Sequence, residues 1–196
     1  MNKLFSNAPT IGLLMTLSSA FSLAQECYDN PNLLTSSSKE FIVHNNDTVT
    51  HLESRIMWAR CLAGISSGAN SICSEGEVAL LNWQEALQYV QTLNASGGLA
   101  GYTDWRLPNP KELASVIEYG CSKPSMNTQV FPNISEVKVW SSTPSVNRTG
   151  ESLLKSWYAD YGDSDTGNGS DSGVVSFANA SRESQQYAVH LIRGAQ

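Results

Sequence analysis

The sequence predicts a single α+β domain, and three observations lead to this prediction. Two stretches in the middle of the 196-residue chain carry helix caps and apolar residues at helical spacing. Short runs rich in β-branched and aromatic residues follow, mostly in the second half of the chain. Four cysteines are present, and an even number can pair as two disulfides. Helices and strands in separate parts of the chain favour an α+β fold over alternating βαβ units.

The first helix is expected over "NWQEALQYVQTLN". Asn82 can cap it, and Glu85 stands three residues later, where it can complete a capping box. The glycines of "ASGGLAG" offer a left-handed residue that ends it. One apolar face recurs at helical spacing and is made of Trp83, Ala86, Leu87, Val90 and Leu93.

The second helix is expected to begin inside "GYTDWRLPNPKEL". Asn109 can cap it, Pro110 occupies the first helical position and Glu112 the third. Gly120 is expected to end it, just before Cys121. Its buried face is predicted to consist of Leu113, Val116 and Ile117.

The predicted strands are short. "EFIVHNNDTVTH" suggests two strands around an Asn-Asn-Asp turn, and "RIMWARC" suggests a third. Beyond Cys121, the runs with strand composition are "VKVWSST", "SWYADY", "GVVSF" and "YAVHLIR".

The N-terminus has the layout of a secretory signal peptide over residues 1–24. Lys3 precedes the apolar run "IGLLMTL", and Ser22 and Ala24 are small residues before a cleavage point at Gln25. The apolar run is too short to span a bilayer, so no transmembrane segment is expected after cleavage. We therefore expect export to the periplasm, the cell surface or the medium, with residues 25–40 as an N-terminal segment and 41–196 as the domain.

The cysteines of an exported chain are expected to form disulfides. Three pairings are possible in principle. The Gly/Ser-rich loop "CLAGISSGANSIC" can fold back on itself, which favours Cys61–Cys73. Cys27–Cys121 would then tie the N-terminal segment to the end of the second helix.

Charge and motifs exclude several classes of function. The net charge is −6, and a chain without a Lys/Arg cluster to offset it is not expected to bind nucleic acid. The histidines His44, His51 and His190 are scattered, and no nucleophile elbow or zinc-protease motif is present. We therefore expect no catalytic residues.

The acidic stretch "DYGDSDTGNGSDSG" could supply calcium ligands. Asp163, Asp165 and Asp171, together with Asp160 before them, offer oxygen ligands near glycines. The bidentate glutamate of an EF-hand is missing at the required spacing, so a solvated hairpin loop is the favoured interpretation. Calcium is the alternative, and no other cofactor is expected.

The ordered segments "RIMWARC", "NWQEALQYVQTLNASGGLAGYTDWRLPNPKELASVIEYGC", "VWSST", "SWYADY" and "YAVHLIRG" resemble the Lcl C-terminal domain family. This bacterial family, long of unknown function, is named after the end domain of a collagen-like adhesin. The resemblance covers about Phe41 to Gly194 and implies a C-type-lectin-like fold, related to the formylglycine-generating enzymes, with two helices on short irregular antiparallel strands. It also implies a role at the cell surface or outside the cell. The adhesin is associated with glycosaminoglycans, but the acidic loop here argues against carrying that binding over.

The motif "DWRLPNPKEL" allows two interpretations. Trp105 and Arg106 could form a ligand platform, since an aromatic face and a guanidinium suit sugars or carboxylates. The favoured interpretation is a structural corner, in which Trp105 packs under the helices and Arg106 pairs with an acidic side chain. The acidic candidates are Asp104, Glu85 and Glu112, and Pro108 completes the motif.

Recognition is expected in the loops of the C-terminal half, by analogy with lectin-like folds. Tyrosines there offer rigid contact area and small polar residues adapt their hydrogen bonds, whereas Trp157 is assigned to the core. The candidate ligand contacts are Tyr158, Tyr161, Asp163, Asp165, Asn168, Asp171 and Tyr187.

The sequence thus predicts an exported, non-catalytic recognition module for a glycan or a cell-surface protein. A structural envelope or extracellular matrix component is the alternative, and a hydrolase is a third. Neither the ligand nor the oligomeric state follows from the sequence.

Overall fold

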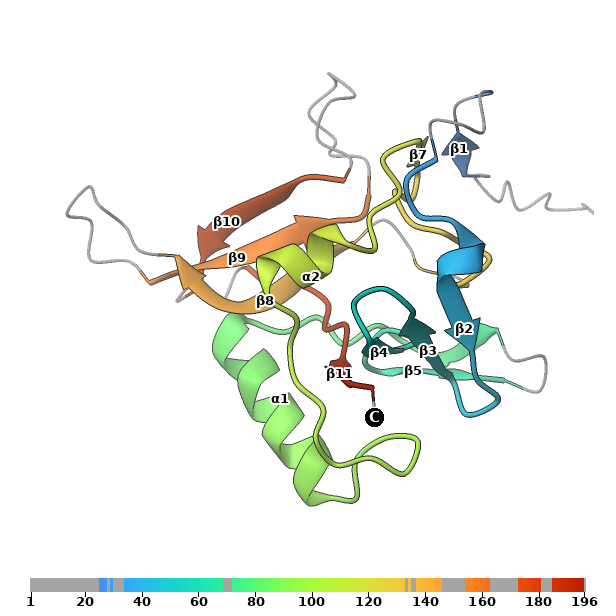
Figure 1. Ribbon diagram of the computed structural model, residues 1–196. Coiled ribbons are helices and arrows are strands. Elements are labelled where there is room, and N and C mark those ends of the chain that lie inside the picture. Colours follow the sequence, from blue (N-terminus) through green and yellow to red (C-terminus); the bar gives the residue numbers. More distant parts are fainter. Residues whose placement is uncertain are drawn as a thin grey trace, which may run out of the picture.

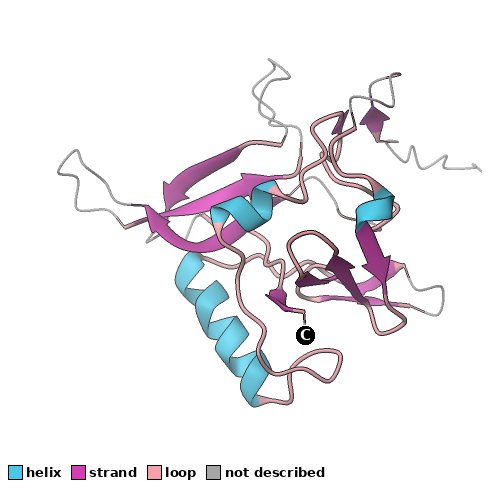
Figure 2. Ribbon diagram, viewed as in Figure 1, coloured by secondary structure: helices cyan, strands magenta, loops and turns pink. Residues whose placement is uncertain are grey.

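The computed structural model describes residues 25–27, 29, 34–68, 72–132, 134, 137–145, 154–162, 173–180 and 185–195. The signal peptide expected over residues 1–24 lies outside these ranges and stays a prediction. Two α-helices, one turn of 3₁₀ helix (Ser38–Glu40) and many short antiparallel strands make up a mixed α+β fold (Figure 2). The predicted class, with two disulfides, is therefore confirmed at this level.

The first sheet has four strands in the order β11-β4-β3-β2. It consists of β2 (Phe41–Val43), β3 (Thr48–His51), β4 (Ile56–Ala59) and β11 (Ile192–Gly194). The predicted hairpin is present, because Val43 pairs with Val49 across the turn, and Asp47 in that turn has a positive φ of 59°. Two two-stranded pairs lie beside it: β5 (Ile65–Ser67) with β6 (Cys73–Gly76), and β1 (Glu26–Cys27) with β7 (Cys121–Ser122).

The second sheet has three strands in the order β10-β9-β8 and lies between the two helices (Figure 1). Its strands are β8 (Lys138–Ser145), β9 (Lys155–Asp160) and β10 (Val175–Asn179). On one face, Val139 and Ala159 share a core with Leu113 of α2. On the other face, Trp140 packs with Val90 of α1. The alternation of side chains along each strand places these two sets on opposite faces.

Helix α1 (Trp83–Ala95) confirms the first predicted helix. The Asn82 side chain accepts from the Glu85 amide at 2.9 Å, and the Glu85 carboxylate accepts from the Asn82 amide at 2.8 Å. This reciprocal pair satisfies two backbone donors that the first turn leaves without helical partners.

Helix α2 (Pro110–Ala114) begins as predicted but ends earlier than Gly120. The amides of Val116 and Ile117 donate to carbonyls three residues back, at 3.4 and 3.3 Å, so the chain tightens into a turn. Ile117 then bridges Met126, which removes this segment from the helix. Leu113, Val116 and Ile117 are nevertheless buried, as the apolar spacing predicted.

The run "YAVHLIR" is only partly a strand, which corrects the prediction of one strand over its length. Ile192 begins β11, whereas Tyr187 forms an isolated bridge with Leu81 and Ala188 one with Val139. The segment therefore passes from one partner to the next instead of extending a single sheet.

Both disulfides join the pairs favoured from the sequence, Cys61–Cys73 and Cys27–Cys121. Cys27–Cys121 connects β1 to β7, and the N-terminal segment is held a second time by Glu118. This buried carboxylate accepts from the amides of Thr35 and Ser36, each at 2.8 Å, and from the amide of Gly120 at 2.9 Å.

His190 is completely buried in an aromatic cluster. Its ring lies 4.8 Å from the Trp58 ring and 5.3 Å from the Phe131 ring, between centroids. The Nε2 atom is 2.8 Å from the Ala59 carbonyl, so Nε2–H is the donor. Burial disfavours the charged imidazolium and lowers the pKa of His190 to about 4, although the bond to Ala59 works in the opposite direction.

We expect stability to fall as the pH drops from 6.5 towards 4. In this window the unfolded chain binds a proton at His190 that the folded protein excludes, so the stability present above pH 6.5 is progressively lost. The full loss is about 3 kcal/mol. Urea unfolding across this pH range measures it. His190→Phe should flatten the profile and His44→Gln should leave it unchanged, whereas a flat profile for the unaltered protein would contradict the assignment.

Candidate functional site

Trp105 is a structural residue of the corner that follows α1. Its indole Nε1 donates to the Leu99 carbonyl at 2.9 Å, and the side chain is buried. The Asn94 amide clamps its backbone, donating to the Trp105 carbonyl at 2.8 Å and accepting from the Trp105 amide at 3.1 Å. With its polar groups paired and its ring covered, Trp105 offers no face to a ligand.

Arg106 pairs with Glu112, one of the three acidic partners considered from the sequence. Its two terminal nitrogens lie 2.8 and 2.6 Å from the two carboxylate oxygens, a bidentate geometry. Glu112 also accepts from the Asn109 amide at 2.7 Å, so one carboxylate caps α2 and holds the arginine. Burial would raise the pKa of Glu112, but these hydrogen bonds and the attraction to the guanidinium outweigh it, and the pKa is lowered.

Asp104 takes a different partner, Arg193 of β11, which sequence reasoning missed. Arg193 Nε lies 2.6 Å from one Asp104 oxygen, and Nη2 lies 3.2 Å from the other. The hydrogen bond from Arg193 is the main cause of the lowered pKa of Asp104. Arg193 is buried under Tyr102, whose ring centroid is 3.8 Å from the guanidinium carbon. Nearly ninety intervening residues hide this pair from any local pattern.

Pro108 completes the corner, because it is buried and its carbonyl accepts from the Ser142 amide of β8 at 2.8 Å. The motif residues Asp104, Trp105, Arg106, Pro108 and Glu112 therefore join α1, α2, β8 and β11.

Tyr161 is not a ligand contact, which corrects the sequence-based assignment. Its side chain is fully buried in the core that also contains Ile117. Its backbone amide donates to Val137 at 3.0 Å and its carbonyl accepts from Ser125 at 2.7 Å. These bonds fix the end of β9 inside the protein, and burial raises the pKa of the phenol.

Tyr158 and Tyr187 lie together on the α1 side of the second sheet. The Tyr187 ring is 4.3 Å from the buried Trp140 ring and 5.0 Å from the Tyr158 ring, between centroids. Both tyrosines are half-buried. Burial, with the nearby Tyr158 and Asp160, raises the pKa of Tyr187 to about 12. The rings form a packed stack with only part of each tyrosine exposed.

The opposite face of the sheet carries an exposed aromatic pair. Trp157 is half-buried, not a core residue as expected, and it meets Phe177 of β10 edge to face at 5.6 Å between ring centroids. Phe177 is 48% exposed. The Lys155 ammonium lies 5.4 Å from the centre of the Phe177 ring. The alternation in "GVVSF" could have placed Phe177 on this face, but nothing in it indicates whether that face is covered.

The remaining candidates Asp163, Asp165, Asn168 and Asp171 lie outside the described residues, so the alternative of a calcium site at this stretch stays a hypothesis. Asp160 is buried, where one oxygen accepts from the Gly162 amide at 3.1 Å and the other lies 3.6 Å from the Lys138 ammonium. Among the residues that the structure does describe, no three His, Cys, Asp or Glu side chains converge as a metal site would require.

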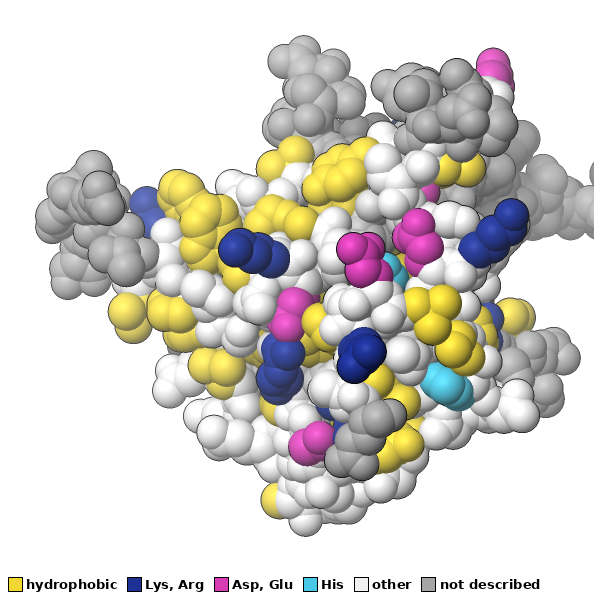
Figure 3. Space-filling view, in the orientation of Figure 1, with side chains coloured by type: hydrophobic (Ala, Val, Ile, Leu, Met, Phe, Trp, Pro, Cys, Tyr) yellow, Lys and Arg dark blue, Asp and Glu magenta, His cyan; other side chains and the backbone are white. Residues whose placement is uncertain are grey.

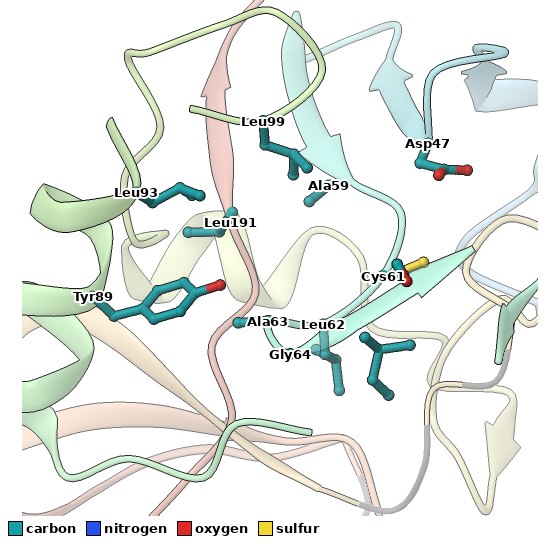
Figure 4. A pocket seen from close by; sticks show the side chains of 12 residues that line it. Asp47, Ala59, Cys61, Leu62, Ala63, Gly64, Tyr89, Leu93, Leu99 and Leu191 are labelled. Atoms are coloured by element: carbon teal, nitrogen blue, oxygen red, sulfur yellow. The ribbon is translucent and has the colours of Figure 1, made fainter. Parts of the chain in front are cut away.

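A small pocket of about 100 Å³ lies between α1, β4 and the turn at Gly64 (Figure 4). Its wall is mostly apolar, with Leu93, Leu99 and Leu191 beside the Tyr89 ring. The Tyr89 hydroxyl bonds to the Gly64 backbone, and burial raises the pKa of Tyr89. A pocket this small, with its phenol already engaged, is a packing void more than a binding site.

These features define a class, a disulfide-linked α+β domain with an arginine-held corner and an aromatic surface pair. A family model, the Lcl C-terminal domain, matches residues 47–193. The chain therefore belongs to this family, as its sequence motifs indicated. No curated protein and no solved structure matches the chain significantly. Within the described part of the chain, no helix has the length and apolar character needed to cross a membrane.

The Arg106–Glu112 pair should stabilise the fold beyond the helix cap. Glu112→Gln keeps an acceptor for the Asn109 amide but loses the charged pair, whereas Glu85→Gln alters a capping box alone. We expect Glu112→Gln to lower the free energy of unfolding by about 1 kcal/mol more than Glu85→Gln. Urea denaturation of both variants measures the difference, and equal costs would show that the pair contributes nothing.

Proposed function

We propose that the protein is an exported, non-catalytic recognition module that binds a glycan or a cell-surface protein through its C-terminal half. The single observation that carries the proposal is the aromatic pair on β9 and β10, in which exposed Phe177 packs against half-buried Trp157. Exposed aromatic rings beside a cation suit both sugar faces and protein side chains.

The surface exists because α2 covers only part of its sheet face. Trp157, Ala159 and Val139 lie on one face by strand alternation, and Val139 pairs with Ala159. Leu113 of α2 packs over Ala159, but the helix is five residues long. The face continues past the helix to Trp157 and Phe177, and hydrophobic side chains gather over this part of the molecule (Figure 3).

The neighbouring surface adds further apolar and charged contacts. Leu154 at the start of β9 is 65% exposed. The Lys155 ammonium over Phe177 adds a positive charge to an acidic protein. Exposed leucine, paired aromatic rings and a cation together are the composition of recognition surfaces.

The two disulfides fit an oxidising, extracytoplasmic compartment. They also make a scaffold stiff enough to present loops. Membership of a family named after an adhesin's end domain agrees with a binding role.

A C-type-lectin-like relationship belongs to the same proposal. Two helices on short antiparallel strands and disulfides near the chain's N-terminal part and its first long loop support it. A structural envelope or matrix component is the second candidate, and a hydrolase the third. Saturable binding on glycan or cell-surface arrays distinguishes the first from the second, and turnover on a broad substrate panel would favour the third.

We expect Trp157→Ala and Phe177→Ala each to weaken binding on such arrays at least tenfold, because each removes half of the aromatic pair. Leu52→Ala is the matched control, since Leu52 is 47% exposed on the turn between β3 and β4. Its binding should match the unaltered protein. Equal binding by all three variants, with unchanged melting temperatures, would rule out this surface.

Calcium at Asp163, Asp165 and Asp171 is proposed as an accessory to this surface. We expect heat release in titration calorimetry with millimolar calcium and a rise in melting temperature, because a cation that binds the folded protein and not the unfolded chain stabilises the fold. Asp165→Asn should abolish both signals. An absence of heat and of thermal shift in the unaltered protein removes calcium from the proposal.

A further inference from the structure

A second, larger pocket of about 470 Å³ lies where the N-terminal segment meets the chain after α2. Among the described residues, one wall is formed by Gln25, Cys27, Asp29, Leu34 and Ser36–Lys39, and the other by Glu118, Cys121 and Met126–Gln129. The family match begins at residue 47, so the first wall lies outside it. In Figure 1 this junction, marked by β1 and β7, lies at the upper right, whereas β9 begins and β10 ends at the left of the view. Its volume falls within the range of pockets that bind small molecules.

Ser36 is fixed in this pocket with its hydroxyl unused. Its amide donates to Glu118 at 2.8 Å, and its carbonyl accepts from the Asn127 side chain at 2.7 Å. The residue is 2% exposed, yet its hydroxyl has no hydrogen-bond partner in the described structure. An unpartnered buried hydroxyl costs stability, which a ligand group at this position would recover.

The rest of the pocket wall is polar. The Glu118 carboxylate accepts from the amides of Thr35, Ser36 and Gly120, so its oxygens are already engaged within the protein. Thr128 donates to Gln25 at 3.0 Å and keeps acceptor capacity on its oxygen. Hydroxyl and amide side chains that each donate and accept match the hydroxyl groups of an uncharged ligand.

The pocket also has an apolar side. Leu34, which is 43% exposed, and Met126 line it together with the Cys27–Cys121 disulfide. C–H faces of a sugar ring or a polyol can pack against such a surface while its hydroxyls meet the polar wall. Asp29 and Lys39 are the other charged residues that line it, so with Glu118 the lining holds two carboxylates and one ammonium and does not favour an anion.

We infer that this pocket binds a small, uncharged, polyhydroxylated molecule, a sugar unit or polyol, with Ser36 as a hydrogen-bonding residue. The site is separate from the Trp157–Phe177 surface, so the two can succeed or fail independently. Covalent closure by Cys27–Cys121 holds both walls in place.

Amide NMR spectra of the purified protein, titrated separately with maltose, N-acetylglucosamine and myo-inositol, test the site. We expect at least one probe to give saturable shifts at residues 36–39 and 128–129. Ser36→Ala should weaken that probe about tenfold, the effect of one hydrogen bond, without lowering the melting temperature. If Ser36 were merely a packing residue, the same variant would leave the affinity unchanged.

Leu34→Ala should also weaken the probe, whereas Leu154→Ala, at the exposed leucine that precedes β9, should not. Three results would overturn the inference: no saturable shift with any probe, shifts indifferent to both Ser36→Ala and Leu34→Ala, or shifts confined to β9 and β10. The last of these would support the proposed recognition surface instead. Shifts retained at residues 36–39, with no binding at β9 and β10, would support the pocket and contradict the proposed recognition surface.

Discussion

The backbone hydrogen bonds of the C-terminal segment, residues 187–195, are the interaction on which the rest of the fold depends. Its backbone forms hydrogen bonds with four separate parts of the chain, at Leu81, at β8, at β4 with the residues after it, and at Arg106. Buried backbone groups must find partners, and this segment supplies them to elements that do not contact one another through a common sheet. In Figure 1 it runs through the middle of the molecule towards β11.

The corner around Trp105 is hydrogen-bonded to this C-terminal segment. The Arg106 amide and carbonyl pair with Ile192 at 2.8 and 2.9 Å, while the Arg106 side chain reaches Glu112 at the start of α2. One residue later, Arg193 pairs with Asp104. Arg106 and Arg193 thus each form an ion pair beside the backbone bridge between Arg106 and Ile192. The motif that first suggested a ligand platform is a joint between the C-terminal segment and the helices.

The two proposed binding surfaces lie away from this joint. The second sheet is covered by α1 on one face and only partly by α2 on the other, so its aromatic pair lies at the edge of a stable core. The N-terminal segment is attached to the chain after α2 by the Cys27–Cys121 disulfide and by hydrogen bonds to Glu118. The first candidate surface therefore lies where the short helix α2 leaves part of the sheet uncovered. The second lies where the N-terminal segment meets the rest of the domain.

The amino-acid sequence by itself determined the local structure: the two capping boxes, the hairpin at Asn45–Asp47 and the apolar faces of the helices, because caps, turns and periodicity act between near neighbours. The tertiary structure alone decided the early end of α2, the burial of Tyr161, the exposure of Phe177 and the Arg193–Asp104 pair. Each of these depends on which distant segment arrives at a given residue, and no local pattern encodes that.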